Sequence, residues 1–434
     1  MFKLNARIKV YETIRLIPTP KYYEFTYVKN VDINSSYKSL TDTATLVMPK
    51  KVYTDTKGFD QSLFANASGE EKTIHDFFKL ENYIEIFLGY DGDYKPAFRG
   101  YITGVQSDIT TATITCEDTM YAFKKVKAVK DDDVQNKNDV LNLVATNPTT
   151  NVENFNPKTF FEKRIKELKL PFKVNALDEE LGNILVNRNQ SLAQVFEMLK
   201  DKGIYTYFKT ELTGPVLTIT NNPQQHTFAE LGGFITRNFI KSPLAGTLVK
   251  KLINQGLSIL SSQLDKAGKS ISSSFPGKAR FRFRYNIIED KLVVVNESTK
   301  NTRTRVEKYF KNSNTPIYIE LGDPNGQLTK THILHNDTDD LPNDPTAFKK
   351  VTTQIASELY QYAALRAMES KPSGFEGSFL TFGEPFVRPT DKVILENAKD
   401  KEKNGTFQVE KVERSFGENG YRQRIFIGRR VEAI

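Results

Sequence analysis

The sequence is poor in the residues that build covalent or metal-bound frameworks. Its 434 residues include no tryptophan and one cysteine, Cys116. A single cysteine excludes a disulfide within the chain and any zinc or iron–sulfur site that needs several thiolates. Long apolar runs are missing as well. Without about 18 consecutive apolar residues, we expect no membrane-spanning helix and no membrane anchor.

The first twenty residues, MFKLNARIKVYETIRLIPTP, lack the uninterrupted apolar core of a secretory signal peptide, so we expect synthesis in the cytoplasm. Aromatic residues are plentiful, because 30 Phe and 19 Tyr make up 11% of the chain. Such a content is typical of folded domains and not of disordered chains. The length allows roughly two to four domains, and the net charge of +8 permits an acidic partner without demanding one.

Residues 1–125 are predicted to be rich in strands. Short segments with alternating apolar residues, many of them β-branched or aromatic, are separated by turn signals such as Asp91-Gly92-Asp93. The segments are Arg7–Tyr11, Tyr22–Val28, Ala44–Met48, Tyr83–Leu88, Ala97–Val105 and Thr111–Cys116. Six or more short strands in about 120 residues predict a small antiparallel barrel or sandwich.

Residues 126–232 are predicted to form an α+β middle domain behind a polar, charge-rich stretch at 124–139. Thr159 and Glu162 have the spacing of a capping box and predict a helix to about Leu168. Ser191 and Gln194 repeat that spacing and predict a second helix. Gly203 is placed as the residue that follows its end.

Residues 233–279 are predicted to be a basic helical or flexible insertion. Leucines recur at roughly helical spacing over Leu244–Lys269, interrupted or flanked by lysines and glycines. The pattern fits a packing helix or an amphipathic helix that binds a partner or a membrane. The serine-rich segment Ser270–Lys278 is expected to be a flexible connection.

Strand patterns return over residues 280–434, which are expected to form a second barrel interrupted by a helix at 344–369. Asp344 as N-cap and Pro345 after it mark the start of that helix, and Val351, Ile355 and Leu359 share one of its faces. Near the end of the chain, the Asn-Gly pair in 417–420 predicts a hairpin turn.

Signals of catalysis are weak, and we predict no catalytic residues, no metal site and no cofactor. The common nucleotide-binding, nucleophile-elbow and zinc-protease motifs are absent. His332 and His335 stand near several aspartates, but an Asn- and Asp-rich surface turn explains this segment better than a metal site. His75 and His226 are isolated, and Cys116 is expected to be a small buried side chain in a strand.

Arginine-rich strands carry the most specific functional pattern. In 280–285, the arginines Arg280, Arg282 and Arg284 alternate with aromatic residues that are expected to face the core, Phe281, Phe283 and Tyr285. The pairs Arg303 and Arg305, and Arg422 and Arg424, repeat this spacing. The face could be ordinary solvated surface, a contact with an acidic protein surface, or the lining of a channel through which nucleic acid passes.

Several segments together resemble baseplate hub proteins of phages, which include late-control D proteins and the hub half of type VI secretion spike proteins. The segment Phe87–Lys125 resembles their first tube domain through Phe98, Gly100, Ile102 and Asp118. Further similar segments are Ser191–Phe208, Phe281–Ser298 and the closing part from Val393, where Arg414 stands at a position that is frequently His in the family.

The resemblance implies a mainly β fold in which two similar tube-type antiparallel barrels flank the α+β middle domain. It further implies a homotrimer with a central channel that joins a hexameric tail tube to a trimeric spike, within the baseplate of a virion or injection particle. DNA or the tape-measure protein would pass through the channel. The seven arginines named above would then line the channel or a subunit interface.

Two features depart from the family. No spike module follows the second barrel, so the resemblance implies a separate spike protein beside other baseplate proteins. The insertion at 233–279 has no counterpart in the family pattern. Two other functions stay open: a different β-rich tail component, such as a distal-tail or fibre-adaptor protein, and a hydrolase with β-rich binding domains.

Overall fold

The computed structural model describes most of the chain. The described residues are 3–50, 74–128, 149–152, 155–178, 181, 184–187, 189–201, 203–223, 239–241, 278–294, 302–310, 312–323, 325–336, scattered positions between 340 and 368, and 375–432. Nearly all of the predicted insertion at 233–279 lies outside them, as does His226.

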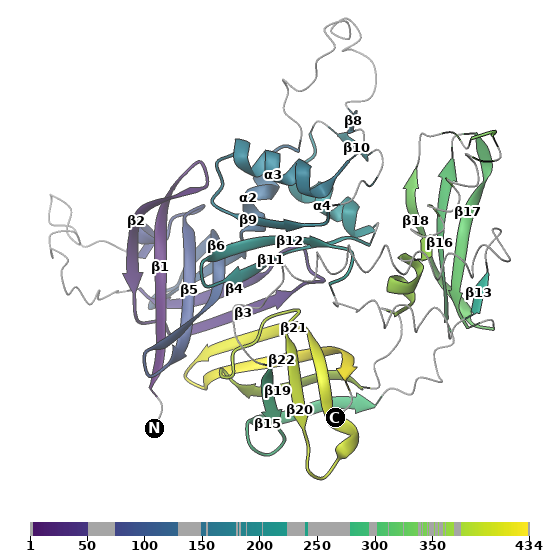
Figure 1. Ribbon diagram of the computed structural model, residues 1–434. Coiled ribbons are helices and arrows are strands. Elements are labelled where there is room, and N and C mark those ends of the chain that lie inside the picture. The colour runs from purple at the N-terminus through teal and green to yellow at the C-terminus, as the bar shows by residue number, and fades with distance from the viewer. Residues whose placement is uncertain are drawn as a thin grey trace, which may run out of the picture.

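One sheet of 13 strands dominates the fold and joins the two ends of the chain (Figure 1). The N-terminal half-sheet consists of β1 (Leu4–Ile14), β2 (Ile17–Phe25), β3 (Asn30–Ser36), β4 (Thr43–Pro49), β5 (Tyr83–Tyr90), β6 (Asp93–Ser107) and β7 (Thr111–Asp118), with the short helix α1 (Ile74–Phe77) before β5. The C-terminal half-sheet consists of β14 (Ala279–Arg282), β15 (Ile287–Val294), β19 (Phe375–Phe382), β20 (Lys392–Glu396), β21 (Gly405–Gly417) and β22 (Gly420–Glu432), with the 3-10 helix η5 (Lys401–Lys403) before β21.

The two half-sheets share one strand order. The N-terminal order is β3-β4-β7-β6-β5-β1, with β2 beyond it, and the C-terminal order is β15-β19-β22-β21-β20-β14. We leave out β2 and number the six strands of each half-sheet from one to six along the chain. Both strand orders then read 2-3-6-5-4-1. The direction differs only at the last pair, because β1 is antiparallel to β5 whereas β14 is parallel to β20. The predicted mainly β fold, antiparallel at both ends, is confirmed.

The correspondence extends to single backbone bonds beside the long hairpins. The amide of Ile102 in β6 donates to the carbonyl of Asn82, just before β5, at 2.9 Å. The amide of Val409 in β21 donates to the carbonyl of Asp391, just before β20, also at 2.9 Å. The chain therefore contains the same local arrangement twice, built from unrelated side chains.

The half-sheets meet edge to edge where β3 pairs with β21. The antiparallel pairing runs from Lys411 opposite Ser36 to Gly417 opposite Asn30. Buried residues alternate with more exposed ones along most of β3 and of this part of β21, so one face of the joint is buried and the other faces solvent. Two residues of the C-terminal half-sheet, Phe416 and Tyr421, belong to the N-terminal core.

The middle of the chain has its own core and packs beside both half-sheets (Figure 1). Its elements are α2 (Met120–Lys125), β8 (Thr149–Val152), α3 (Pro157–Glu167), β9 (Lys173–Ala176), β10 (Ile184–Asn187), α4 (Leu192–Asp201), β11 (Tyr205–Glu211) and β12 (Gly214–Thr220). This confirms the α+β character expected of the segment. In sheet order, β11 pairs with β12, and β12 pairs in parallel with β9.

The two predicted capping boxes have different outcomes. Ahead of α4, the amide of Ser191 donates to the side chain of Gln194 at 2.8 Å and the amide of Gln194 donates back at 3.3 Å, as predicted. The predicted cap of α3 was wrong by three residues. Asn156 caps that helix, because its side-chain oxygen accepts the amide of Thr159 at 3.1 Å and Pro157 occupies the first helical position.

The hairpin of β11 and β12 is clamped by arginines from both half-sheets. Arg99 of β6 donates to the carbonyls of Glu211 and Leu212, while its guanidinium is paired with Glu85 at 2.7 Å. Arg388, in the segment before β20, donates to the carbonyl of Thr210 at 2.5 Å. Carbonyl groups near the hairpin turn are thereby satisfied by charged donors that are themselves buried.

The segment between β15 and β19 differs from the expected second barrel. Strands β16 (Thr302–Phe310), β17 (Ser313–Gly322) and β18 (Gln327–Asn336) form a separate four-stranded sheet with β13 (Phe239–Lys241). The described positions from 346 to 368 that belong to a helix bury Ile355 and Leu359 against this sheet. The predicted helix therefore packs its apolar face on this separate sheet and not on the second half-sheet.

Strand β14 alternates as predicted along its length. Phe281 is fully buried and packs against Phe379, with ring centroids 5.1 Å apart, whereas Arg280 and Arg282 are exposed. A buried aromatic ring flanked by exposed arginines fixes which face of the strand meets the core.

The alternation ends at a turn after β14. The amide of Tyr285 donates to the carbonyl of Arg282 at 3.1 Å, and Arg284 adopts a left-handed backbone with φ of 69°. Phe283 is only half-buried and Tyr285 is 82% exposed. The expectation that Tyr285 faces the core is therefore wrong, because the turn breaks the two-residue period before it.

The two sides of β14 can be separated by mutation. Phe281→Ala removes a ring from the C-terminal core and is expected to lower the free energy of unfolding by about 3–5 kcal/mol. Arg282→Ala removes an exposed ion pair and should cost less than about 1 kcal/mol. Urea unfolding of both variants measures the difference. Equal destabilisation by the two substitutions would contradict the assignment of faces.

Candidate functional site

The solvent face across the joint carries an open polar hollow. It is formed by side chains of β3, β4, β19, β21 and β22, so both half-sheets contribute to it. Rows of opposed residues cross the joint: Asp32 lies opposite Ser415, and Asn34 lies opposite Glu413. The hollow is therefore a property of the joined sheet and of neither half alone.

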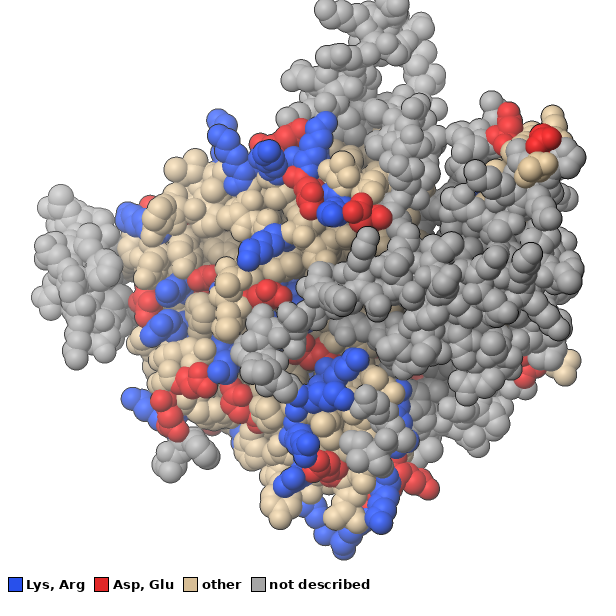
Figure 2. Space-filling model, viewed as in Figure 1, with Lys and Arg blue, Asp and Glu red and all other residues tan. Residues whose placement is uncertain are grey.

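Charges on this face are balanced within the chain. Arg424 of β22 pairs with Glu289 of β15 at 2.5 Å, and Lys291 pairs with the same carboxylate at 2.9 Å. The hydrogen bond from Arg424, with a second from Lys291, lowers the pKa of Glu289. Figure 2 shows basic and acidic side chains interspersed over the described surface of the two half-sheets. Fixed positive charge is thus offset by carboxylates close by.

Two of the predicted arginines lie on this face and two lie on β14. Arg422 of β22 stacks over the ring of Phe382, 4.8 Å from its centroid, next to Arg424 on the same side of the strand. On β14, Arg280 and Arg282 both pair with Glu396 of β20, at 3.2 and 2.7 Å. Arg284 occupies the turn after β14.

The remaining two predicted arginines lie in a different sheet. Arg303 of β16 pairs with Glu320 of β17 at 3.2 Å, and Arg305 pairs with Glu307 at 3.0 Å. Arg305 also lies over the ring of Tyr318, 3.9 Å from its centroid. The seven arginines therefore do not form one patch, and sequence spacing alone could not show that two different sheets carry them.

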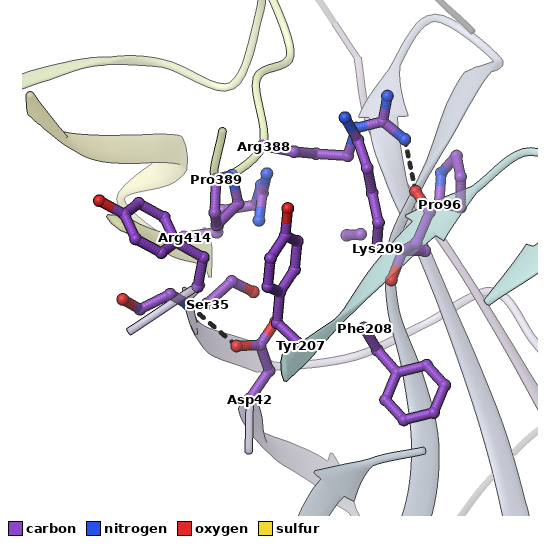
Figure 3. A pocket seen from close by; sticks show the side chains of 13 residues that line it. Ser35, Asp42, Pro96, Tyr207, Phe208, Lys209, Arg388, Pro389 and Arg414 are labelled. Carbon is purple, nitrogen blue, oxygen red and sulfur yellow. Dashed lines mark hydrogen bonds between the residues drawn. The ribbon is translucent and has the colours of Figure 1, made fainter. Parts of the chain in front are cut away.

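A buried ionic junction lies where the middle of the chain meets both half-sheets (Figure 3). Arg414 of β21 is buried and donates to the carbonyl of Val387. Lys209 of β11 pairs with Asp391 at 3.4 Å, and both side chains are largely buried. Buried charges of this kind need partners, because an unpaired ion in the interior is costly.

Asp42, just before β4, is the acidic centre of this junction. Its carboxylate accepts the amide of Ser36 at 2.9 Å and lies within the electrostatic reach of Arg414. Burial raises the pKa of Asp42 to about 6 in spite of these partners. Burial, together with the nearby charge of Asp42, also raises the pKa of Asp118 well above its usual range.

The junction is too small to be a substrate site. Its cavity volume is about 20 Å³, which is room for roughly one water molecule. The lining is formed by β3, β6, β11, β21 and the segments that precede β4 and β20. These groups fasten three parts of the chain together. Sequence reasoning noted Arg414 only for its place in a family pattern and missed Asp42, since nothing local in the sequence signals burial of a single carboxylate.

The described residues offer no arrangement for metal chemistry. Among them, no three His, Cys, Asp or Glu side chains converge on a point. His75 contacts the hydroxyl of Ser107 at 2.9 Å. His332 and His335 belong to β18 and not to a surface turn. Cys116 is buried in β7, and burial raises the pKa of its thiol.

Within the same described part of the chain, no helix has the length and apolar character needed to cross a bilayer.

The comparisons with known proteins show the fold but not a sequence family. No family model matches the sequence, and no curated protein matches it. Solved structures match over almost the whole chain. The 43 kDa tail protein of prophage MuSo2 from Shewanella oneidensis has 10% identity and a TM-score of 0.51, and the match covers 98% of each chain.

Two further matches have lower TM-scores. The tail protein from Neisseria meningitidis MC58 has 11% identity and a TM-score of 0.48, over 98% of this chain and 96% of that one. A chain of the half-lidded Francisella PdpA–VgrG complex has 9% identity and a TM-score of 0.49, over 98% of this chain and 58% of that one. The match to the MuSo2 tail protein shows that this chain shares the fold of a prophage tail protein, which agrees with the fold that the sequence resemblance implies.

The partly buried carboxylate of Asp42 makes a testable contribution to stability. Because its pKa is raised on folding, the unfolded chain ionises first as the pH rises, and the stability that Asp42 contributes below about pH 4 is lost by about pH 6. Asp42→Asn keeps an oxygen for the amide of Ser36 and removes the titration. Relative to the unmodified protein, we expect the variant to gain on the order of 1–3 kcal/mol between about pH 4 and about pH 6.5.

Urea unfolding at a series of pH values measures this gain, with Asp93→Asn, at an exposed carboxylate, as the control. A difference between Asp42→Asn and the unmodified protein that stays constant over this pH range would show that Asp42 does not titrate as described.

Proposed function

We propose that this chain is the structural hub of a tail baseplate, in a phage or in a phage-like injection system. The observation that carries the proposal is the repeated strand order of the two half-sheets, joined through β3 and β21 within a fold shared with a prophage tail protein. A hub joins parts of different symmetry, and a chain that contains one arrangement twice is suited to that task.

The repeat makes a homotrimer the natural assembly. Three copies present six similar half-sheets, which can match the sixfold symmetry of a tail tube on one side. The same three copies match a threefold spike on the other side. Closed rings of this kind are the usual outcome when copies of one chain associate head to tail with the right rotation. We infer as partners a hexameric tail tube protein, a separate trimeric spike protein and other baseplate proteins.

The solvent face of the joined sheet is the proposed lining of the central channel. The residues that support this assignment are polar or paired, as in Asp32 opposite Ser415 and Arg424 bound to Glu289. Unpaired arginines would attract phosphate strongly, whereas a lining of neutralised charges allows DNA or a tape-measure protein to slide past. Arg422 and Arg424 belong to this lining in the proposal.

The other predicted arginines take different places in the proposal. Arg280, Arg282 and Arg284 lie at the β14 margin, where a neighbouring subunit would contact them. Arg303 and Arg305 lie in the separate sheet of β16 and β17 and would face outward components of the baseplate. The role is structural in this proposal, and no reaction is assigned to the chain. The particle would be assembled in the bacterial cytoplasm.

Light scattering coupled to size exclusion tests the proposed assembly. We expect a species of three chains, each of 49.4 kDa, because two half-sheets per chain give six units only in a trimer. A stable hexamer would favour the alternative of a distal-tail protein. A chain that stays monomeric at all concentrations up to about 100 µM would contradict the hub. At about 100 µM, chains that bind one another with a micromolar Kd would still be associated.

A further inference from the structure

Strand β15 is the last strand at one end of the joined sheet. Among the described residues, β19 is the only strand that pairs with it. On its other edge, one bridge joins its first residue, Ile287, to Phe283 after β14, and residues 288–294 have no described strand beside them. Two apolar side chains at this edge are exposed, Ile288 by 47% and Val293 by 64%. An open edge with apolar side chains is a typical site for pairing with another strand.

Strand β6 has a second open edge. Its first part pairs with β5 up to Tyr101, and Ile102 still bonds to Asn82 on that side. Beyond this point, residues 103–107 pair with β7 on one side only, and no described strand lies along the other. Within the described ranges, no strand pairs with the backbone groups on that side.

The C-terminal half-sheet shows what fits such an edge. Strand β21 corresponds to β6, and its last part, residues 411–417, pairs with β3. Both strands lead into two-residue turns, which are closed by Gly417 and Gly420 in one case and by Asp108 and Thr111 in the other. If Gly417 is matched with Asp108 and the residues are counted back from there, residues 411–417 of β21 correspond to residues 102–108 of β6. The part of β6 without a second partner strand, 103–107, is thus the counterpart of the part of β21 that pairs with β3.

The same counting matches β15 with β3. From Gly104 of β6, four residues before its turn, the cross-strand pairing leads through β7 and β4 to Asp32 of β3. From Glu413 of β21, four residues before its turn, the pairing leads through β22 and β19 to Glu289 of β15. Strand β15 therefore holds in the C-terminal half-sheet the place that β3 holds in the N-terminal one.

We propose that β15 of one copy pairs antiparallel with residues 103–107 of β6 in the next copy, and so repeats the β3–β21 joint between subunits. This inference rests on the proposed trimeric hub. The register follows from the internal joint. Asp32 lies opposite Ser415, so Glu289 lies opposite Gln106 of the next copy.

The joint closes a ring without any further contact type. Each copy offers one β15 edge and one β6 edge, so internal and intermolecular joints alternate around the assembly, and six joints of one geometry join three chains. The other end of the sheet is a poorer partner for β15. That end is β2, in which Pro18 and Pro20 lack the amide hydrogen needed for a strand ladder.

A cysteine pair tests both the partner and the register. Directly opposed residues of antiparallel strands have Cα atoms about 4.5–5.5 Å apart, within the range that a disulfide spans. The double variant Gln106→Cys/Glu289→Cys should therefore oxidise between copies. On a non-reducing gel, we expect most chains to move to three times the mass of one chain, and reductant should reverse the shift.

The internal joint supplies a matched control. The double variant Asp32→Cys/Ser415→Cys places cysteines at the corresponding positions within one chain and should form a bond without any increase in mass. A second control, Gln106→Cys/Val293→Cys, puts the cysteines four residues out of register and should remain uncrosslinked. The native thiol of Cys116 is buried and present in all three variants.

The outcomes separate the joint from the trimer. If light scattering gives a trimer and the internal control oxidises, but Gln106→Cys/Glu289→Cys stays at the mass of one chain, the joint is wrong while the hub stands. A chain that is monomeric in solution overturns the hub and the joint together. Crosslinked ladders beyond three chains would support the strand pairing and overturn the closed ring. Equal crosslinking of the out-of-register control would overturn the register.

Discussion

The pairing of β3 with β21 is the constraint on which the rest of the structure depends. It joins residues 30–36 to residues 411–417, so segments from opposite ends of the chain lie side by side. Because strand pairing fixes which side chains share a face, the buried and solvent faces of the two half-sheets are continuous across it. Phe416 and Tyr421 then complete the N-terminal core, and the polar hollow on the other face includes residues of both halves.

The middle of the chain is positioned by the same joint. Its β11–β12 hairpin is clamped by Arg99 from one half-sheet and by Arg388 from a segment of the other. Together with residues of β11, Asp42 and Arg414 line a cavity that has room for about one water molecule. Since a buried charge that loses its partner is strongly destabilising, these contacts hold the three parts in one relative orientation. A hub that bears load between a tube and a spike would need such rigidity.

Local features of this structure were predictable from the sequence, and long-range ones were not. The Ser191 capping box and the buried Phe281 follow from patterns within a few residues. The β3–β21 joint connects segments almost 380 positions apart, and no local pattern specifies such a pairing. The same reason explains why strands β16 and β17 were expected in the second barrel, since a strand pattern does not say which sheet a strand joins. Of the candidate site, spacing indicated the faces of the arginines but not their carboxylate partners.

The central claim is that the two half-sheets form one cooperative sheet through β3 and β21, and amide hydrogen exchange tests it most directly. The account predicts that amides of residues 30–36 and 411–417 are protected as strongly as those of the buried strands β4, β7 and β22. They should exchange only through the same opening as those strands, because breaking the joint exposes both cores. Fast, independent exchange of β3 and of this part of β21, with the other strands still protected, would contradict the account.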